Sequence, residues 1–476
     1  MGQIVSRVLT LLLAWVVIPA VSAATVHANA ALPERLAGHG GPIRSITVGP
    51  DGKDVLTTSF DYSAILWSLS GGDGTVLKRL FGHDTAVNDA IFLADGGAAT
   101  VSDDGVLILW DLDAGTVRHR IPGTGDKIID IAVSPAGDVL ALASWDHTIR
   151  LHDAETGALT ATLKGHRGSV NAVRFSADGR SLFTASYDGT LREWDVQTGA
   201  LRRRLVDHGW SINVLERLPD GKLAYGLLDG TGFVLDPVSG EKAATLAKHD
   251  GPVLGLTVSE SGKLIATGGG DGRIRVSDAV TGKVLEEFEN PFGPVWALAF
   301  AKGDRALFYA GLDDFVSVWT IEPRKPFETV DSVFPRRFQA SADMDPGERE
   351  FARKCSICHT LEKDGKFRAG PTLFGLFGRR VGTVPGYPYS EALKSADFVW
   401  NEETIDKLFD LGPHEYTPGS KMPLQRIRDP ERRSALIAYL KRVTDPSRAG
   451  SRPSAAATRE DGKDNAANPE GQETPQ

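Results

Sequence analysis

The stretch Ser186-Tyr187-Asp188-Gly189-Thr190-Leu191-Arg192-Glu193-Trp194 decides the fold of most of this chain, because its aspartate and the residue six positions later recur at a nearly constant interval. The repeated aspartates lie 41 to 43 residues apart, at Asp61, Asp104, Asp146, Asp188, Asp229, Asp271 and Asp313. Six residues after them come Trp67, Trp110, His152, Trp194, Leu235, Ser277 and Trp319. Self-similarity at this period indicates an array of equivalent structural units.

A Gly-His pair, or a remnant of it, precedes most of the repeated aspartates by 21 to 23 residues. These pairs are Gly38-His39, Gly82-His83, Gly165-His166, Asp207-His208 and Lys248-His249, and in the third and seventh repeats the pair is lost to Gly123-Thr124 and Asn290-Pro291. Apolar residues alternate within the units, as in Val170–Phe175, and Asp-Gly turns follow, as in Asp178-Gly179. Both features predict short antiparallel strands.

This period, with its Gly-His and Trp-Asp punctuation, resembles the WD-repeat family, whose units are four-stranded propeller blades. The resemblance implies a multidomain chain with an all-β seven-bladed propeller over residues 24–320, in which residues 32–36 supply the outer strand of the last blade and close the ring. It also implies a structural hydrogen-bonded network in one blade, made of His166, Ser186, Asp188 and Trp194. Propellers of this family are interaction platforms, so a protein partner is expected at one end of the ring.

A second motif, Cys355-Ser356-Ile357-Cys358-His359, reads C-x-x-C-H and holds both cysteines of the chain. Two thiols three positions apart can add to the vinyl groups of one haem, which places His359 under the iron. A zinc site would need further Cys or His ligands at metal spacing, and a dithiol redox motif would be expected beside a βαβ pattern. The motif therefore predicts one covalently attached haem c with Cys355 and Cys358 as attachment points, His359 as iron ligand, and no disulfide.

Met422 is the predicted ligand on the opposite face of the iron. Apart from Met1, which lies in the apolar N-terminal segment of residues 1–23, the chain has two methionines, Met344 and Met422. Met344 precedes the helix that leads into the haem motif, whereas Met422 lies in a Pro-Gly loop that can reach the other face. His414 and an open sixth position are the alternatives. His359 with Met422 leaves no position for a substrate, and a thioether ligand raises the reduction potential.

Residues 345–445 resemble the class I cytochromes c of the mitochondrial type. The resemblance rests on the haem motif and on four ordered blocks, GPTLFGLFGR at 370–379, PGYPYS at 385–390, WNEET at 400–404 and PGSKM at 418–422. It implies a small all-α domain whose first and last helices cross at Gly347. It further implies that Pro371 accepts a hydrogen bond from His359. The residues that it places at the haem propionates are Arg379, Tyr387, Tyr389, Trp400 and Ser420.

Three further segments have distinct compositions. Residues 1–23 combine Arg7, an apolar run and small residues before Ala24, which predicts a cleaved signal peptide and a periplasmic location. The run of about 14 apolar residues is too short to span a bilayer, so no stable membrane anchor is expected. Residues 321–344 are rich in proline and charge and predict a linker. Residues 446–476 have too little apolar content to fold.

The composition narrows the class of function. With 41% hydrophobic residues the 476-residue chain can form globular cores, and a net charge of −9 argues against non-specific nucleic-acid binding. The propeller sequence has no phosphate loop, nucleophile motif or metal-ligand cluster, so no catalytic residue is assigned. The leading hypothesis is a mono-haem electron carrier that meets a redox partner through its haem edge and propeller face. A binding scaffold with the haem as redox sensor, or an oxidoreductase with a substrate site on the propeller, remain alternatives, and the oligomeric state stays open.

Overall fold

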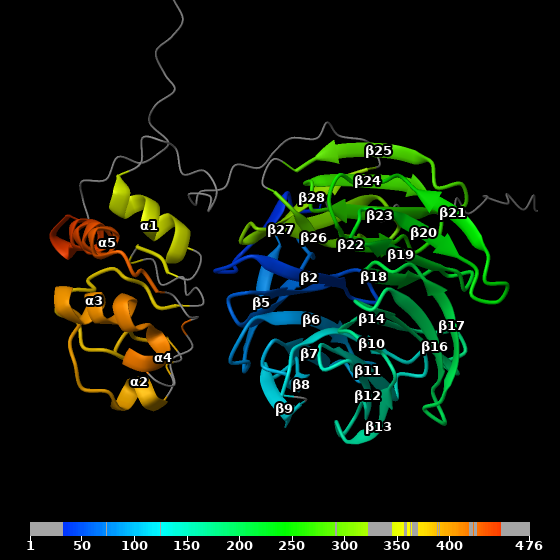
Figure 1. Cartoon of the computed structure of the whole chain (residues 1–476), viewed down its shortest axis with the longest axis horizontal. Coiled ribbons are helices and arrows are strands. Elements are labelled where there is room, and N and C mark those ends of the chain that lie inside the picture. The colour runs from blue at the N-terminus through cyan, green and yellow to red at the C-terminus, as the bar shows by residue number, and fades with distance from the viewer. Residues whose placement is uncertain are drawn as a thin grey trace, which may run out of the picture.

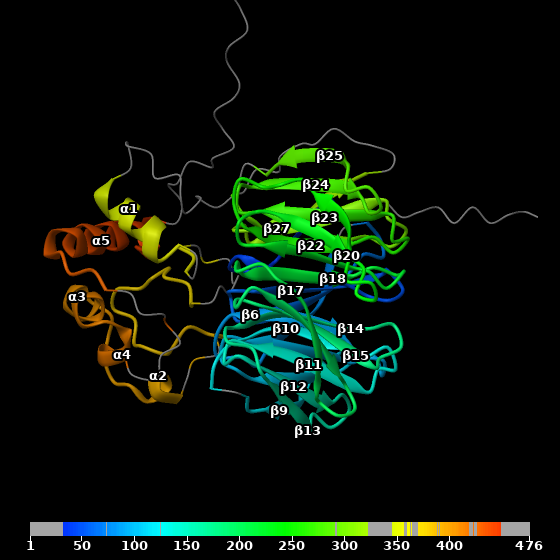
Figure 2. The ribbon, with the colours of Figure 1, turned by 45° about the vertical axis from the view of Figure 1, so that its right-hand side comes forward.

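The computed structural model describes residues 32–321, apart from 73, 124, 291 and 292, and residues 345–448, apart from 357, 358, 362, 364–369, 388, 390, 418–421 and 423–425. Figures 1 and 2 show these residues as a ring of β-sheets and a group of helices. The predicted signal peptide, nearly all of the predicted linker and most of the predicted tail lie outside the described residues. No helix within the described ranges has the length and apolar character needed to cross a membrane.

Seven four-stranded antiparallel sheets form the ring, so the predicted seven-bladed propeller is confirmed. Six blades consist of four strands that are consecutive in the chain. The first three are β2 (Ile43–Val48), β3 (Asp54–Ser59), β4 (Ser63–Ser68) and β5 (Thr75–Phe81); β6 (Val87–Phe92), β7 (Ala98–Ser102), β8 (Leu107–Asp111) and β9 (Thr116–Ile121); and β10 (Ile128–Val133), β11 (Val139–Ser144), β12 (Thr148–Asp153) and β13 (Leu159–Lys164). The next three are β14 (Val170–Phe175), β15 (Ser181–Ser186), β16 (Thr190–Asp195) and β17 (Leu201–Asp207); β18 (Ile212–Arg217), β19 (Leu223–Leu227), β20 (Gly232–Leu235) and β21 (Lys242–Leu246); and β22 (Val253–Val258), β23 (Leu264–Gly269), β24 (Arg273–Asp278) and β25 (Val284–Glu289).

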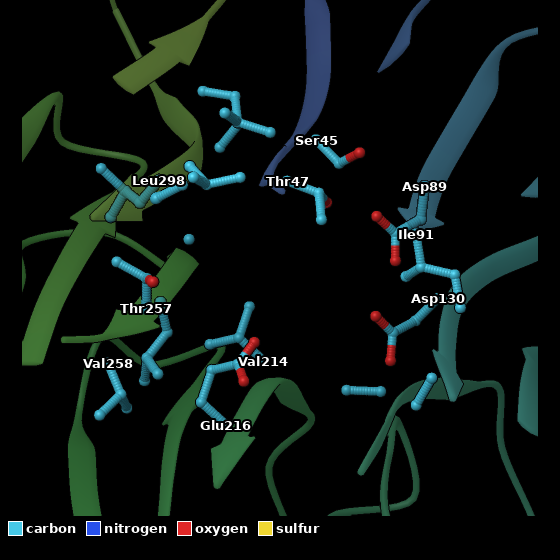
Figure 3. Close-up of a pocket in the computed structure, with 18 of the residues that line it drawn as sticks. Ser45, Thr47, Asp89, Ile91, Asp130, Val214, Glu216, Thr257, Val258 and Leu298 are labelled. Carbon is cyan, nitrogen blue, oxygen red and sulfur yellow. The ribbon is translucent and has the colours of Figure 1, made fainter. Parts of the chain in front are cut away.

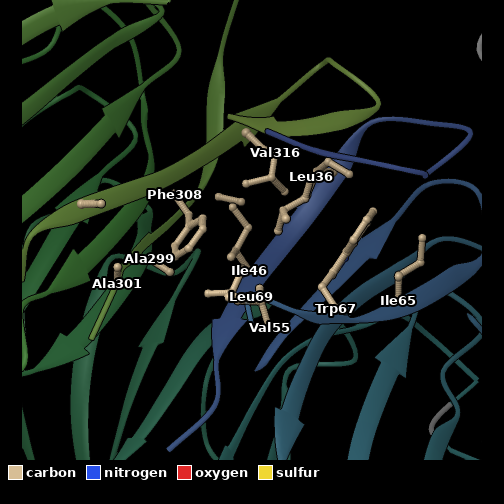
Figure 4. Close-up of a cluster of buried hydrophobic side chains, with 14 residues drawn as sticks. Leu36, Ile46, Val55, Ile65, Trp67, Leu69, Ala299, Ala301, Phe308 and Val316 are labelled. Carbon is tan, nitrogen blue, oxygen red and sulfur yellow. The ribbon is translucent and has the colours of Figure 1, made fainter. Parts of the chain in front are cut away.

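The last blade is built from both ends of the propeller sequence. It contains β26 (Val295–Phe300), β27 (Ala306–Gly311) and β28 (Phe315–Thr320), and its fourth strand is β1 (Arg35–Ala37). Strand β1 pairs with β28 in antiparallel register, with Leu36 opposite Val316. Both side chains are fully buried in a cluster with Phe308 and Trp67 (Figure 4). The predicted closure by the N-terminal segment is therefore confirmed, with the strand at Arg35–Ala37 where residues 32–36 were expected, and β1 covers the outer edge of β28.

The buried polar network of a blade differs from the predicted one in one member. In the β14–β17 blade, Nδ1 of His166 donates to Asp188 at 2.9 Å and its Nε2 accepts from the hydroxyl of Thr184 at 2.7 Å. The indole N–H of Trp194 donates to the same Thr184 hydroxyl at 2.8 Å. Ser186, the last residue of β15, contacts the network at Asp188: its hydroxyl accepts from the backbone N–H of Asp188 and donates to the carbonyl oxygen of Gly168, both at 3.1 Å. Thr184, and not Ser186, thus joins His166 to Trp194.

Other blades keep this arrangement to different degrees. In the β2–β5 and β6–β9 blades, Thr57 and Thr100 bridge a loop histidine and the repeat tryptophan in the same way. In the β22–β25 blade, His249 and Thr267 are 2.9 Å apart, although Ser277 replaces the tryptophan. In the β18–β21 blade, His208 bonds the hydroxyl of Tyr225 at 3.0 Å. In both blades a hydroxyl thus satisfies Nε2 of the loop histidine, which would be costly to desolvate without a partner.

The described helices lie between residues 346 and 448. They are α1 (Pro346–Lys354), α2 (Glu391–Ser395), α3 (Glu402–Leu411), α4 (Pro413–Tyr416), α5 (Pro430–Val443) and the 3₁₀ turn Pro446–Arg448. Asp345 caps α1, and Asn401 forms a capping box with Thr404 at the start of α3. The 3₁₀ turn shows that the ordered chain extends past residue 446, because Asp445 accepts a hydrogen bond from the backbone N–H of Ser447.

Helices α1 and α5 cross in close contact at Gly347. A Cβ atom at Gly347 would lie 2.1 Å from the carbonyl oxygen of Ala435 and 2.6 Å from Cβ of Tyr439. Only glycine therefore allows this approach. One turn further along α1, the rings of Phe351 and Tyr439 lie 5.7 Å apart. The crossing thus positions the C-terminal end of α1, where the C-x-x-C-H motif begins.

Candidate functional site

The C-x-x-C-H motif begins directly after α1, and two backbone hydrogen bonds tie its described residues to the end of the helix and to one another. The N–H of Cys355 donates to the carbonyl oxygen of Phe351, and the N–H of His359 donates to the carbonyl oxygen of Cys355, each at 2.9 Å. Cys355 is 4% exposed, so its thiol faces the apolar interior of the helical region. Cys358 lies outside the described residues. The turn places the thiol of Cys355 and the imidazole of His359 one helical turn apart.

The orientation of the His359 ring is set by a backbone carbonyl. Nδ1 of His359 lies 2.8 Å from the carbonyl oxygen of Pro371. A carbonyl oxygen only accepts hydrogen bonds, so Nδ1 carries the hydrogen and Nε2 is the nitrogen with the lone pair that would bind a metal. The N–H of Leu373 donates to the carbonyl oxygen of Thr360 at 2.8 Å and holds the Pro371 loop beside the motif. This is the geometry that the resemblance implied for Pro371.

Gly370 is a site residue that sequence reasoning did not assign. A Cβ atom there would lie 2.2 Å from Cε1, 2.5 Å from Nδ1 and 2.7 Å from Nε2 of His359. Real Cβ atoms do not approach this closely, so any other residue would displace the ring or the loop. In the sequence, Gly370 stands out only as the residue before Pro371, at the start of the block GPTLFGLFGR at 370–379. Its meaning required the position of the ring.

Met422 lies against the apolar cluster that contains Cys355. The buried members of this cluster include Phe351, Phe409 and Leu436, and Met422 packs on it as a partly buried side chain. Ser420 and most chain neighbours of Met422 lie outside the described residues, as does the side chain of His414. The structure therefore brings the predicted Met422 ligand to the same apolar interior as the haem attachment residue.

Three of the predicted propionate residues come from one connected part of the chain. Arg379 donates from its guanidinium to the carbonyl oxygens of Phe374 and Thr372, both at 2.8 Å. Burial lowers the pKa of Arg379, and nearby Tyr389 opposes this shift. The backbone N–H of Trp400 donates to the carbonyl oxygen of Arg379 at 2.9 Å, which fixes the two residues side by side.

Tyr387 and Tyr389 form a pair in this region. Their rings lie 4.7 Å apart with an edge-to-face geometry. Burial raises the pKa of the Tyr389 phenol, so the group stays protonated and can donate a hydrogen bond at neutral pH. The two phenols, with Arg379, are the types of donor that anionic carboxylates bind.

These residues fit a covalently bound haem. They supply a buried thiol at Cys355, an imidazole at His359 with its tautomer fixed by Pro371, and a thioether at Met422 on the same apolar cluster. A haem held by this donor set supplies one-electron redox chemistry. The protein residues orient the imidazole, exclude water through the cluster and offer hydrogen-bond donors to acidic groups.

The propeller contains a separate central cavity of about 730 Å³. Figure 3 shows Asp89 and Asp130 on one side of this cavity and Thr257 and Leu298 on the other. Arg174 bonds Asp130 at 2.7 Å and makes a two-point contact with Glu216. Burial and the nearby Asp130 raise the pKa of Asp89 to about 7. Within the described residues no group of three or more His, Cys, Asp or Glu side chains could hold a metal ion.

Comparisons with known proteins match two different families to this chain. The model of the family described as "WD domain, G-beta repeat" matches residues 32–68, 74–111, 115–153, 157–195 and 240–278. The chain is 45% identical over 102 residues to a protein named cytochrome c from Sesamum indicum, and this covers 21% of the chain and 91% of that protein. It is also 45% identical over 104 residues to cytochrome c from Chlamydomonas reinhardtii, covering 22% of the chain and 92% of the relative. Cytochrome c from Gibberella zeae is 41% identical over 105 residues, covering 22% of the chain and 98% of the relative.

Proposed function

Because this chain belongs to the cytochrome c family through its C-terminal domain, carries covalently attached haem c and joins that domain to a WD-repeat propeller, we propose that it is a periplasmic electron carrier whose propeller docks a redox partner. The haem domain accepts and passes on single electrons. The propeller provides the surface that selects the partner. The proposal assigns no substrate chemistry of its own to the chain.

The observation that carries the proposal is the hydrogen bond between His359 and Pro371. It supports the proposal because it holds the hydrogen on Nδ1 and leaves the lone pair of Nε2 available to a haem iron. Met422, on the same apolar cluster, is the proposed ligand on the other face. Two protein ligands leave no coordination position for oxygen or a substrate, and they change little between oxidation states. This arrangement favours electron transfer over catalysis at the iron.

The role of the propeller is supported by its structure and its family. Its buried His, Asp and Trp side chains are engaged within the blades, as at His166 and Trp194. WD-repeat propellers act in protein interactions in general. A propeller on the same chain as a haem domain holds a bound partner close to the haem, because the linker limits their separation and raises the effective concentration.

The periplasmic location is part of the proposal. It is supported by the signal-like sequence of residues 1–23 and by the haem attachment motif at residues 355–359. Mass spectrometry of the purified protein checks it directly. A mature N-terminus at Ala24 with one haem added supports the proposal, whereas an intact N-terminus in the cytoplasmic fraction contradicts it.

Electron transfer is tested with the purified full-length holoprotein. Ascorbate should reduce it completely, the ferrous form should not bind carbon monoxide at neutral pH, and the ferric form should not bind cyanide readily. Reduction of the haem by small organic substrates, without another protein, would contradict the carrier role. Reoxidation of the haem by membranes that contain a terminal oxidase would support it, and the isolated propeller added in excess should slow that reaction by competition.

A further inference from the structure

The inner strand of every blade has a β-bulge at its second residue, and these bulge residues ring one mouth of the central cavity. A bulge turns a side chain out of the regular alternation. In three blades the bulge residue is an asparagine whose amide donates to a carbonyl of the next blade. Asn88 donates to Ile128, Asn171 to Ile212 and Asn213 to Val253, at 2.9, 2.9 and 3.2 Å.

Arg44 occupies the same bulge position in the first blade and makes no such bond. Its guanidinium lies over the rings of Phe60 and Trp296, at 5.6 and 5.7 Å from their centres. Its Nε is buried without a hydrogen-bond partner, and within the described part of the chain the guanidinium has no ion pair. Burial lowers the pKa of Arg44, and Asp103 and Asp89 only partly oppose this. A half-buried cation held by two aromatic rings, with its Nε hydrogen unused, is poised to bind an anion.

Three acidic residues at this mouth and on its loops are already engaged by other side chains. Asp103 accepts from Lys127 at 2.6 Å and from Asn88 at 2.8 Å. On the neighbouring loops Asp84 pairs with Arg120, and Asp250 pairs with Arg273. Arg44 and the exposed Arg167 have no ion-pair partner among the residues that the structure describes. This end of the ring therefore has cationic groups left to match an acidic partner.

The cavity itself limits how an anion can bind. Below Arg44 the lining includes the carboxylates of Asp89, Asp130 and Glu216. An anion that entered further would meet these acids, so a carboxylate on Arg44 must stay at the mouth. The rest of the bound molecule then lies outside the cavity, over the loops. This favours a segment of a protein over a small molecule enclosed in the cavity.

The loops around this mouth present exposed aromatic side chains. Trp145 and Tyr187 directly precede repeated aspartates, as Phe60 does, so all three belong to the same end of the ring. The side chain of Trp145 is 41% exposed and that of Tyr187 is 63% exposed, and Trp210 on the loop before β18 is 57% exposed. Exposed tryptophan and tyrosine are enriched at the energetic centres of protein interfaces.

We infer that this end of the propeller binds an acidic peptide segment of a partner protein, with a partner carboxylate on Arg44 and apolar contacts on Trp145, Tyr187 and Trp210. The inference rests on the proposed role of the propeller in docking a partner. It adds the chemistry of the segment that is recognised and the residues that recognise it.

The probe is a random dodecapeptide library selected on the full-length holoprotein, followed by fluorescence anisotropy with the synthesised winners. We expect the selected peptides to be enriched in Asp or Glu beside apolar residues. Arg44→Asn should weaken their binding by at least about tenfold, the value of a charge-assisted contact. Asn is the residue that three other blades carry at this position, so the variant should keep its melting temperature. Tyr187→Ala and Trp210→Ala should also weaken the binding of the same peptides.

Arg180→Asn is the matched control, because Arg180 is exposed in the β14–β15 turn at the other end of the ring. Winners without acidic residues, or equal binding to the Arg44→Asn variant, would overturn the inference. Full competition by millimolar free glutamate would also overturn it, since the site would then serve small carboxylates. Haem reduction by ascorbate is measured on every variant. It should not change, so a failure of peptide binding is distinguished from a failure of the electron-carrier function.

Discussion

Gly370 lies directly against the imidazole ring of His359, on the same loop whose Pro371 carbonyl accepts the Nδ1 hydrogen. One residue supplies the space for the ring and the next supplies its orientation. The loop therefore acts on the ligand from two sides. The geometry of the iron ligand depends on the backbone of residues 370 and 371 as much as on the histidine.

Gly370→Ala should disturb the iron ligand without removing it. The added Cβ would meet the ring at 2.2 Å, so the imidazole must tilt or the loop must move. We expect a lower reduction potential, a changed ferric spectrum and faster haem ligand exchange with imidazole. Gly378→Ala is the control, because a Cβ at Gly378 meets open space and only its φ of +85° is unfavourable. Gly378→Ala should cost about 1 kcal/mol of stability and leave the spectrum unchanged. Identical spectra for wild type and Gly370→Ala would contradict this role.

Met422→Ala should open one coordination position of the iron. Loss of the thioether lowers the reduction potential, because methionine favours the ferrous state. The ferrous variant should bind carbon monoxide at neutral pH, which is read from the absorption spectrum. Met344→Ala is the matched control, since it removes the other methionine of the region. If Met344→Ala and not Met422→Ala opened the position, the assignment of the ligand would be wrong.

Thr184→Val should destabilise the propeller by about 2 to 4 kcal/mol. The substitution keeps the shape but leaves the buried Nε2 of His166 and the indole N–H of Trp194 without their shared partner. Each buried group left unsatisfied costs about 1 to 3 kcal/mol. Thr184→Ser should restore most of the loss, which separates the hydroxyl from the packing of the methyl group. Chemical denaturation followed by tryptophan fluorescence measures both, and Ser186→Ala should cost less than Thr184→Val.

Asp89→Asn should stabilise the propeller at alkaline pH and not at acid pH. The folded state raises the pKa of Asp89 to about 7, so it favours the protonated form. Wild-type stability is then fully present below the ordinary aspartate pKa of about 4 and falls as pH rises towards 7. The variant lacks this loss. We expect its melting temperature to exceed that of wild type by about 5 °C at pH 8 and to match it near pH 4. Asp113→Asn, at an exposed position, should show no such divergence.

The propeller was predictable from sequence because its signal is periodic. Asp188 and Trp194 recur at a nearly constant interval, so the number of units followed from spacing, and the resemblance to the WD-repeat family implied the blades and the closing strand. The role of Thr184 in joining His166 to Trp194 could not be predicted in this way. Thr184 and Ser186 are both small hydroxyl residues, and they lie two positions apart on β15. Only the path of the strand shows which hydroxyl faces His166 and Trp194.

The haem attachment site was also predictable from sequence. The roles of Gly370 and Arg44 were not, because they depend on contacts that only the structure shows. The haem motif at residues 355–359 was assigned from its own spacing, and the Pro371 contact was implied by the resemblance to class I cytochromes c. Gly370 became a site residue only when its distance to His359 was known. Arg44 looks like any polar residue on a strand, and its special position depends on a bulge and on Trp296, 252 residues away in the chain.

The pairing of β1 with β28 also determines the order in which the chain can fold. Blades one to six consist of contiguous strands and can form as soon as each segment of the chain is available. The last blade joins residues 35–37 to residues 315–317, so ring closure must wait until almost the entire propeller has been delivered. The chain leading to the haem domain leaves the ring from β28. A mechanical pull on the cytochrome is therefore transmitted first to the seam where the two ends of the propeller meet.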